Sequence, residues 1–317
     1  MMNHPRIAIF GDLLYDCFIW AHRLPREGET VTGYASGFFA SGKGGNQAAV
    51  CAKLGADAHM LGKVGADERG EILLSAMRDS HVNVDAVLVD PKHPTGTDCV
   101  LVADGGKNAI VVAPNANAEV TLEEVAAMRP EFQAAQAALF QLQINADAVE
   151  AAMALARECG CTVVLNPAPA CEIPNSMLAV ADYVTPNETE CEFFTGVYRR
   201  DYADISAWCD AAGKAMHDRG VRRLIITLGE YGAYYSDSET KFILPAFRIN
   251  AVDSTAAGDA FNGGFTCAIA RGESVRSAMR YGSACGAITA SRRGSLPSLP
   301  DGDEVEQFLK EHKEIEV

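Results

Sequence analysis

The chain has 317 residues, of which 48% are hydrophobic and 22% are charged, and its formal net charge is −15. This length and composition are typical of a globular protein that buries a large core. Nucleic acids and anionic membranes bind clusters of Lys and Arg, and because the sequence has no basic run, both are poor candidate partners.

Ten cysteines are scattered along the chain without a Cys-x-x-Cys spacing. In a chain of this length the pattern favours reduced, buried thiols over a disulfide framework or a zinc site. The sequence also lacks a recognisable signal peptide and any apolar run long enough to span a membrane. We therefore expect a cytoplasmic protein.

The first 113 residues are rich in β-strand signals, interrupted by two helical patterns. The predicted elements are a strand at 7–10, several strands within 13–40, a helix at 46–55, a strand at 58–64, a helix at 68–80, and a hairpin of strands 97–102 and 109–112 with its turn at 104–108.

From about residue 120 onward, strands and helices alternate regularly. Strands are predicted at 138–142, 162–165, 183–185 and 223–228, and helices at 147–159 and 205–219. This order predicts an α/β fold with a mainly parallel sheet covered on both faces. The β-rich pieces at about 13–40 and 97–113 look inserted, so we expect a small β-sheet lid on a single domain of residues 1–317.

The stretch 252–265 is the most informative one for function. We expect an apolar strand at 242–249 to lead into a helix at Ala256, Ala257 and Gly258, whose free backbone N–H groups and helix dipole would attract a phosphate. Asp259, in the first helical turn, could accept a proton from a hydroxyl that attacks the phosphorus. Taken alone, Asp259 could equally be an ordinary helix cap.

The Gly-rich segment 41–46 opens the predicted helix at 46–55. It fails as a phosphate-binding loop because Gly44 replaces the Ser or Thr that holds magnesium, and it fails as a dinucleotide fingerprint because Gln47 replaces the third glycine. Lys43 and Asn46 as donors, beside glycines, suit a polyhydroxylated small molecule. The alternative is a flexible connection.

Two further strand ends carry polar residues. Residues 186–190 predict a helix start capped by Thr185 or Asn187, or, beside a phosphate, oxygen ligands for magnesium from Asn187 and Glu190. Thr227 and the glycines that follow it form a turn that could pass beneath a nucleotide, although this signal is weak by itself.

The residues together resemble the ribokinase-like carbohydrate kinases of the phosphofructokinase-B type, and the match runs essentially from end to end. The family's two signatures are matched by residues 42–48 continuing to 62–67, and by residues 253–259. Between them, residues 166–170, 185–190 and 226–229 are similar to ribokinase segments. The resemblance implies a three-layer α/β/α fold and ATP-dependent phosphorylation of a sugar hydroxyl.

The resemblance also implies roles for individual residues. Asp259 matches the catalytic base, and Ala256, Ala257 and Gly258 match the anion hole. The implied sugar-binding residues are Asp16, Gly42, Lys43, Asn46, Gln143 and Asp259. The implied nucleotide-binding residues are Asn187, Thr227, Gly229, Gly232 and Gly258. Glu190 matches an outer-shell magnesium position. The residues that match a potassium site are Asp253, Thr255, Thr289, Arg292, Gly294 and Ser298.

Two positions depart from the family pattern. Leu14 stands where ribokinases carry an Asn, and Gln143 stands where they carry a Glu, and both positions contact ribose in the family. An unpaired hydroxyl costs about 1–3 kcal/mol, so we expect weaker ribose binding. A nucleoside or ketose kinase therefore stays open, as does a catalytically silent sugar-binding protein. The lid of ribokinases also forms a dimer interface, which implies a homodimer.

Overall fold

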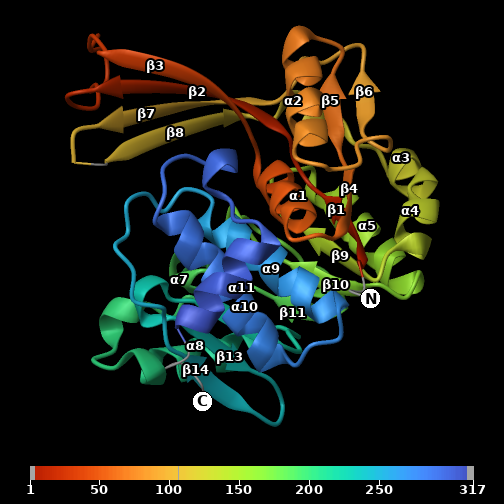
Figure 1. Cartoon of the computed structure of the whole chain (residues 1–317), viewed down its shortest axis with the longest axis vertical. Helices are drawn as coiled ribbons and strands as arrows, with labels where there is room; N and C mark the ends of the chain where they lie inside the picture. The colour runs from red at the N-terminus through yellow and green to blue at the C-terminus, as the bar shows by residue number, and fades with distance from the viewer. Residues whose placement is uncertain (1–3, 106, 313–317) are drawn as a thin grey trace.

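The structure, a computed structural model, describes residues 4–105 and 107–312. An eight-stranded sheet crosses its body (Figure 1). In spatial order its strands are β14 (Lys241–Leu244), β13 (Ala233–Ser236), β12 (Leu224–Thr227), β11 (Tyr183–Val184), β10 (Thr162–Leu165), β9 (Ala137–Phe140), β1 (Arg6–Phe10) and β4 (Asp57–Leu61). The strands from β12 to β4 run parallel, and β13 is antiparallel to both of its neighbours, β12 and β14.

A second, four-stranded sheet projects from the body (Figure 1). Its strands in order are β3 (Ala35–Ser41), β2 (Leu14–Ala21), β7 (Thr97–Ala103) and β8 (Asn108–Ala113). The segments at 13–40 and 97–113 thus meet in one sheet, as expected. Gly106, in the predicted hairpin turn, lies outside the described residues. A short pair, β5 (Lys63–Gly65) and β6 (Leu88–Asp90), stands apart.

Helices cover both faces of the large sheet. The α-helices are α1 (Lys43–Lys53), α2 (Glu68–Asp79), α3 (Leu122–Ala127), α4 (Arg129–Ala134), α5 (Ala146–Glu158), α6 (Asn175–Val180), α7 (Glu188–Thr195), α8 (Ile205–Asp218), α9 (Ala257–Ala270), α10 (Val275–Ala290) and α11 (Gly302–Glu311). Short 3-10 turns are η1 (Asn115–Glu119), η2 (Arg199–Asp201), η3 (Gly229–Tyr231) and η4 (Leu296–Ser298).

Alternation along β1 separates two cores, one on each face of the sheet. Ile7 and Ile9 pack with α1, α2, α9, α10 and α11, whereas Ala8 and Phe10 pack with the helices from α3 to α8. Successive side chains of a strand point to opposite faces, so a strand buried on both faces is apolar throughout. The expected three-layer α/β/α arrangement is confirmed.

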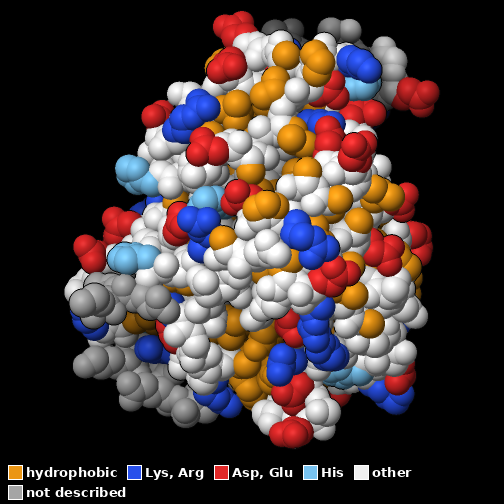
Figure 2. Space-filling model, turned by 90° about the vertical axis from the view of Figure 1, so that its right-hand side faces the viewer, with side chains coloured by type: hydrophobic (Ala, Val, Ile, Leu, Met, Phe, Trp, Pro, Cys, Tyr) orange, Lys and Arg blue, Asp and Glu red, His pale blue; other side chains and the backbone are white. Residues whose placement is uncertain are grey.

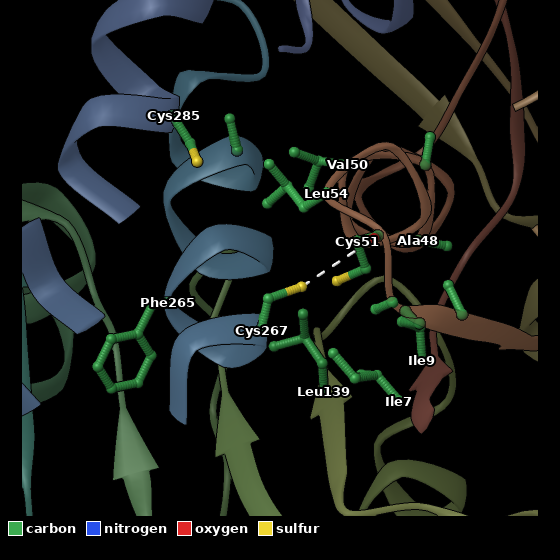
Figure 3. Close-up of a cluster of buried hydrophobic side chains, with 14 of the residues drawn as sticks. Ile7, Ile9, Ala48, Val50, Cys51, Leu54, Leu139, Phe265, Cys267 and Cys285 are labelled. Carbon is green, nitrogen blue, oxygen red and sulfur yellow. Dashed lines mark hydrogen bonds between the residues drawn. The ribbon is translucent and has the colours of Figure 1, made fainter. Parts of the chain in front are cut away.

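Helices α1 and α9 pack closely, and this contact positions the site. Cys51 and Cys267 meet between the two helices above Ile7 and Leu139 (Figure 3). A Cβ atom at Gly263 of α9 would lie 2.1 Å from Val50 Cγ1 of α1. Because this glycine has no side chain, the start of each helix comes within reach of the other.

Three sequence predictions need correction. β14 ends at Leu244, so residues 245–256 reach α9 as an irregular segment and not as a strand. The predicted strand at 58–64 is two strands, β4 and β5. Helix α1 begins at Lys43, three residues before the predicted start, so the Gly-rich segment is its first turn and not a flexible connection.

Among the described residues, no helix combines the length and apolar character needed to cross a membrane. On the face shown in Figure 2, acidic and basic side chains are intermingled.

Candidate active site

Asp259 lies in the first turn of α9 and faces the start of α1. Its side chain is 7% exposed. Asn46 Nδ2 donates to one carboxyl oxygen at 3.0 Å, and Gln47 Nε2 donates to the other at 2.9 Å. Two amides from α1 therefore fix the orientation of a buried carboxylate that carries no other described side-chain partner.

The amide contacts continue into a buried polar network below Asp259. Gln47 Nε2 also donates to Asn166 Oδ1 at 3.0 Å, and Gln141 Nε2 donates to Gln47 Oε1. Asn166 in turn donates to the backbone carbonyl of Thr185 at 3.2 Å. The network joins the carboxyl ends of β9, β10 and β11, the edge at which parallel sheets bind ligands.

Asp12, directly after β1, holds the start of α1. Its carboxyl group accepts from the backbone N–H groups of Lys43 at 3.2 Å and Gly44 at 3.0 Å. A Cβ atom at Gly44 would lie 2.7 Å from the Asp12 backbone. Gly42 has φ 101° and is similarly crowded by Asp12, so the glycines allow close packing of helix and strand end.

Burial raises the pKa of Asp12 to about 6, against the lowering effects of the Gly44 N–H and the Lys43 charge. A carboxyl group whose pKa is higher in the folded than in the unfolded state gives stability that is lost as pH rises through the folded value. Relative to Asp12→Asn, wild type should therefore lose about 2 kcal/mol of unfolding free energy between pH 4.5 and 7. Urea titrations at both pH values measure this difference.

The matched control is Asp204→Asn, at the exposed N-cap of α8. Its stability difference from wild type should change little over the same pH range. A constant difference between wild type and Asp12→Asn would contradict the assignment.

The N-terminus of α9 is open to an anion. Ala256 has φ 60°, and no side chain caps the helix. Ala256 and Ala257 are half-buried, Gly258 is exposed, and a Cβ atom at Gly258 would meet nothing within 4 Å. A helix N-terminus presents N–H groups without helical partners and a positive dipole end. Of the three predicted anion-hole residues, Ala257 already donates its N–H to the Ser254 carbonyl at 3.1 Å.

Asn187 and Glu190 cap α7 reciprocally. The Asn187 side chain accepts from the Glu190 N–H, and Glu190 Oε2 accepts from the Asn187 N–H, both at 2.8 Å. Burial raises the pKa of Glu190, Lys43 opposes that rise, and the Asp259 charge adds to it. The helix-cap interpretation is thus confirmed. Glu190 also lies close enough to Asp259 for the two charges to interact.

The predicted nucleotide loop follows β12. Thr227 forms a bridge with Asn187, which places the two strand ends side by side. Gly229 has φ 52° and Gly232 has φ 103°. A Cβ atom at Gly232 would lie 1.9 Å from the Leu244 carbonyl oxygen, so this turn requires glycine.

Three of the six predicted potassium-site residues are joined by hydrogen bonds. Asp253 accepts from the N–H groups of Thr255 at 3.0 Å and Gly294 at 3.1 Å. Thr289 is fully buried, and its Oγ1 has no hydrogen-bond partner among the described residues. The Arg292 side chain points elsewhere, to Glu304 on α11. Ser298 Oγ donates to the Ser295 carbonyl.

The remaining predicted sugar residues lie at the base of the small sheet and after β9. Asp16 is 6% exposed and Leu14 is 2% exposed, both on β2. An added Cβ atom at Gly96 would lie 2.8 Å from the Leu14 side chain. Gln143 is half-buried, whereas Gln141, two residues earlier, is fully buried in the polar network.

Comparison with known proteins shows the family of the chain. Residues 4–302 match the model of the pfkB family carbohydrate kinases. The chain belongs to this family. It is 35% identical to the ribokinase of Haemophilus influenzae over 306 residues, which cover 96% of this chain and 98% of that protein. It is 31% identical to a deoxyribokinase of Salmonella typhimurium over 304 residues, with 96% and 98% coverage.

Solved ribokinases share the fold of this carbohydrate kinase. The enzyme of Thermotoga maritima superposes with a TM-score of 0.86 at 28% identity, covering 96% of this chain and 99% of that one. A ribokinase of Arabidopsis thaliana, complexed with ribose and ATP, superposes with a TM-score of 0.87 at 28% identity, covering 97% and 99%.

Sequence reasoning missed part of this kinase's polar network. Gln141 was not singled out, and Gln47 was noted only as a departure from a dinucleotide fingerprint. Asp12 received no predicted role, and Asn166 was included only in a segment similar to ribokinase. The available signal was their common position after parallel strands.

Proposed function

We propose that the chain transfers the γ-phosphoryl group of ATP to a hydroxymethyl group of a small sugar. The observation that carries this proposal is Asp259, a buried carboxylate held by Asn46 and Gln47 beside the uncapped N-terminus of α9. A base next to an anion site is the arrangement that phosphoryl transfer to an alcohol requires. The ribose and ATP bound by the Arabidopsis ribokinase support both ligands.

In this mechanism the sugar oxygen forms a bond to the γ-phosphorus as the bond to the β,γ-bridging oxygen breaks. Asp259 takes the hydroxyl proton, and ADP leaves. The N–H groups at Ala256, Ala257 and Gly258 stabilise the negative charge on the transferring group. The small sheet acts as a lid that excludes water, and residues 1–317 function as one unit.

The sugar has suitable partners in the site. Asn46 Oδ1 is buried and has no hydrogen-bond partner among the described residues, so a sugar hydroxyl could donate to it. Lys43 and Asp16 add a donor and an acceptor, and Gly42 and Gln143 complete the proposed sugar site. A buried polar atom without a partner costs stability unless a ligand satisfies it.

ATP would lie between the loop after β12 and the start of α9. The proposed floor of the ATP site is formed by Thr227, Gly229 and Gly232. The phosphates of ATP would lie near Asn187 and Gly258. Two observations support this placement. A bridge joins Asn187 to Thr227, and both loop glycines have the positive φ angles that the turn needs.

The residues present fit two cations. Residues 4–105 and 107–312 contain no cluster of three His, Cys, Asp or Glu, which suits Mg²⁺ bound mainly by phosphates and water, with Glu190 in its outer shell. Bound Mg²⁺ would neutralise phosphate charge. The unpartnered Thr289 Oγ1 and the Asp253 carboxylate fit K⁺, with backbone carbonyls at Thr255, Arg292, Gly294 and Ser298 as further ligands.

The acceptor differs from ribose if Leu14 and Gln143 line the pocket. Leu14 cannot hydrogen-bond to a sugar hydroxyl, whereas the Asn of ribokinases can. A sugar that lacks this hydroxyl should therefore lose less binding free energy in this protein than in a ribokinase. The similarity to a deoxyribokinase supports a deoxypentose. A ketose or nucleoside acceptor remains the alternative.

A substrate screen tests the function. Purified protein is assayed for ADP release with ribose, deoxyribose, fructose and nucleosides, with and without Mg²⁺ and K⁺. Sugar-dependent ADP release is expected. ATP consumption that no acceptor increases would instead favour the catalytically silent, sugar-binding alternative.

The small sheet also supports a homodimer. Alternation places Phe18, Phe39, Val100 and Ile110 on the same face as Asp16. Phe39 is 43% exposed and Ile110 is 54% exposed. Exposed apolar side chains gathered on one sheet are typical of an association surface.

Ile110→Asp should convert the dimer to a monomer, because a charge on this face would be buried without a partner. Sedimentation velocity measures the change. Val111→Asp is the matched control, since Val111 is 73% exposed on the opposite face and should keep the wild-type sedimentation coefficient. An Ile110→Asp protein that sediments like wild type would exclude this face as the interface.

A further inference from the structure

Two acidic side chains stand opposite each other at the base of the lid. Asp16 of β2 pairs in register with Asp98 of β7, two strands that lie side by side in Figure 1. Residues in register on neighbouring strands point to the same face of the sheet. The charge of Asp98 raises the pKa of Asp16, so the paired carboxyl groups favour a state in which they share one proton.

Neither carboxyl group forms an ion pair with a described Lys or Arg. Asp16 Oδ1 and Asp98 Oδ1 are both buried, and no described donor reaches either atom. The main influences on Asp16 are burial, Asp98, the Ser41 hydroxyl and Asp12, and none of them is a Lys or Arg. Burial and Asp98 raise the pKa of Asp16 to about 8, and burial also raises that of Asp98.

The pair belongs to the acceptor side of the site. Asp16 follows Leu14 on the same face of β2, and Ser41 of β3 completes that face beside α1. The negative charge of Asp12 reaches Asp16, and that of Asp259 reaches Asp12. A second acid beside a sugar-binding acid is unfavourable in the empty protein, because like charges in a buried place cannot both ionise.

We propose that Asp98 is a specificity-determining residue that, together with Asp16, binds a protonated amino group on the acceptor. The inference rests on the proposed sugar kinase function and narrows its substrate class to amino-deoxy sugars. An ammonium group supplies both the positive charge and the several N–H donors that this acid pair lacks.

The proton balance is simple. The free pair holds one shared proton, and binding of the ammonium group releases that proton to solvent, which leaves two carboxylates paired with one cation. A neutral hydroxyl leaves the shared proton in place and can only donate to one carboxyl oxygen, so it forms no ion pair. The pair therefore distinguishes an amine from the hydroxyl in the same position.

Matched sugar pairs test this selectivity. The probes are D-ribose against 2-amino-2-deoxy-D-ribose, and D-fructose against 1-amino-1-deoxy-D-fructose. Wild type should favour an amino sugar over its parent in kcat/KM by about ten- to hundredfold, the range of a hydrogen bond to a charged group. Asp98→Ala should lower kcat/KM for each amino sugar by this factor relative to its effect on the parent sugar, so that the preference is lost.

Asp98→Asn keeps the shape of the side chain and replaces Asp98→Ala in this test if that variant does not fold. It should also lose the preference. Asp104→Ala removes an exposed acid at the far end of the same sheet, and it should keep the wild-type ratio. A wild-type preference for the parent in both pairs, or an equal loss of both activities in the Asp98 variants, would overturn the proposal.

A binding measurement separates this inference from the kinase proposal. Calorimetric titration of the whole protein with each sugar needs no turnover. Tighter binding of the amino sugars that depends on Asp98 supports the inference even if no sugar is phosphorylated. If the protein phosphorylates neutral sugars but binds both amino sugars more weakly than their parents, the inference is wrong and the kinase proposal still holds.

Discussion

Asp259→Asn is expected to lower kcat by about 10²- to 10⁴-fold, the usual contribution of a positioned general base. Asn has the same shape and can still accept from Gln47, and its amide nitrogen can donate to the unpartnered Asn46 Oδ1 after that amide turns over. The fold and the nucleotide affinity should therefore be unchanged. Steady-state kinetics with the best acceptor from the screen, and a fluorescence titration with ATP, measure the two effects.

Asp204→Asn is the control for a carboxyl-to-amide change at a helix start, because Asp204 caps α8 in the solvent. It should retain wild-type kcat. A nearly wild-type rate in Asp259→Asn would remove the mechanism, and a large loss of ATP binding in that variant would assign Asp259 to the nucleotide instead.

Gly44→Ala is expected to reduce both stability and activity. Its Cβ atom would lie 2.7 Å from backbone atoms of Gly11 and Asp12, so α1 must move away from the end of β1. Overpacking of this kind costs about 1–3 kcal/mol. Since α1 carries Lys43 and Asn46, kcat/KM should fall more than tenfold. Urea unfolding and kinetics on the same preparation measure both.

Gly302→Ala is the matched control, because the nearest atom to its added Cβ would be 3.8 Å away, an ordinary contact. Gly302 also begins a helix, α11. Its stability should equal or slightly exceed that of wild type. A Gly44→Ala protein as stable and active as Gly302→Ala would show that α1 tolerates displacement from β1.

The sequence predicted the regular elements well because their signals are local. Alternation in apolar runs, Ala-rich helices and Gly stops placed most strands and helices within a few residues. The error at β14 has a physical cause. Residues 245–249 keep an apolar alternation, but β14 pairs only as far as Leu244, and pairing beyond that point depends on tertiary contacts that no local pattern reports.

The site was less predictable because its contacts are distant in sequence. Asn46 and Asp259 are 213 residues apart, and Gln141 reaches Gln47 across 94. The motifs identified Asn46 and Asp259 separately, through resemblance, and the packing of α1 on α9 joins them. No sequence pattern indicated a role for Asp98, because only the register of β2 and β7 places it beside Asp16.

The four-stranded sheet is attached to the body at one place. β2 starts four residues after β1 ends, and β3 ends two residues before α1 starts, so both strands join the body beside Asp12. Asn117 holds this junction by hydrogen bonds to the Leu13 backbone at 3.3 and 2.9 Å. A small rotation about this anchored point would sweep the far tip of the sheet through a wide arc, so a small displacement beside Asp12 would be amplified along the strands.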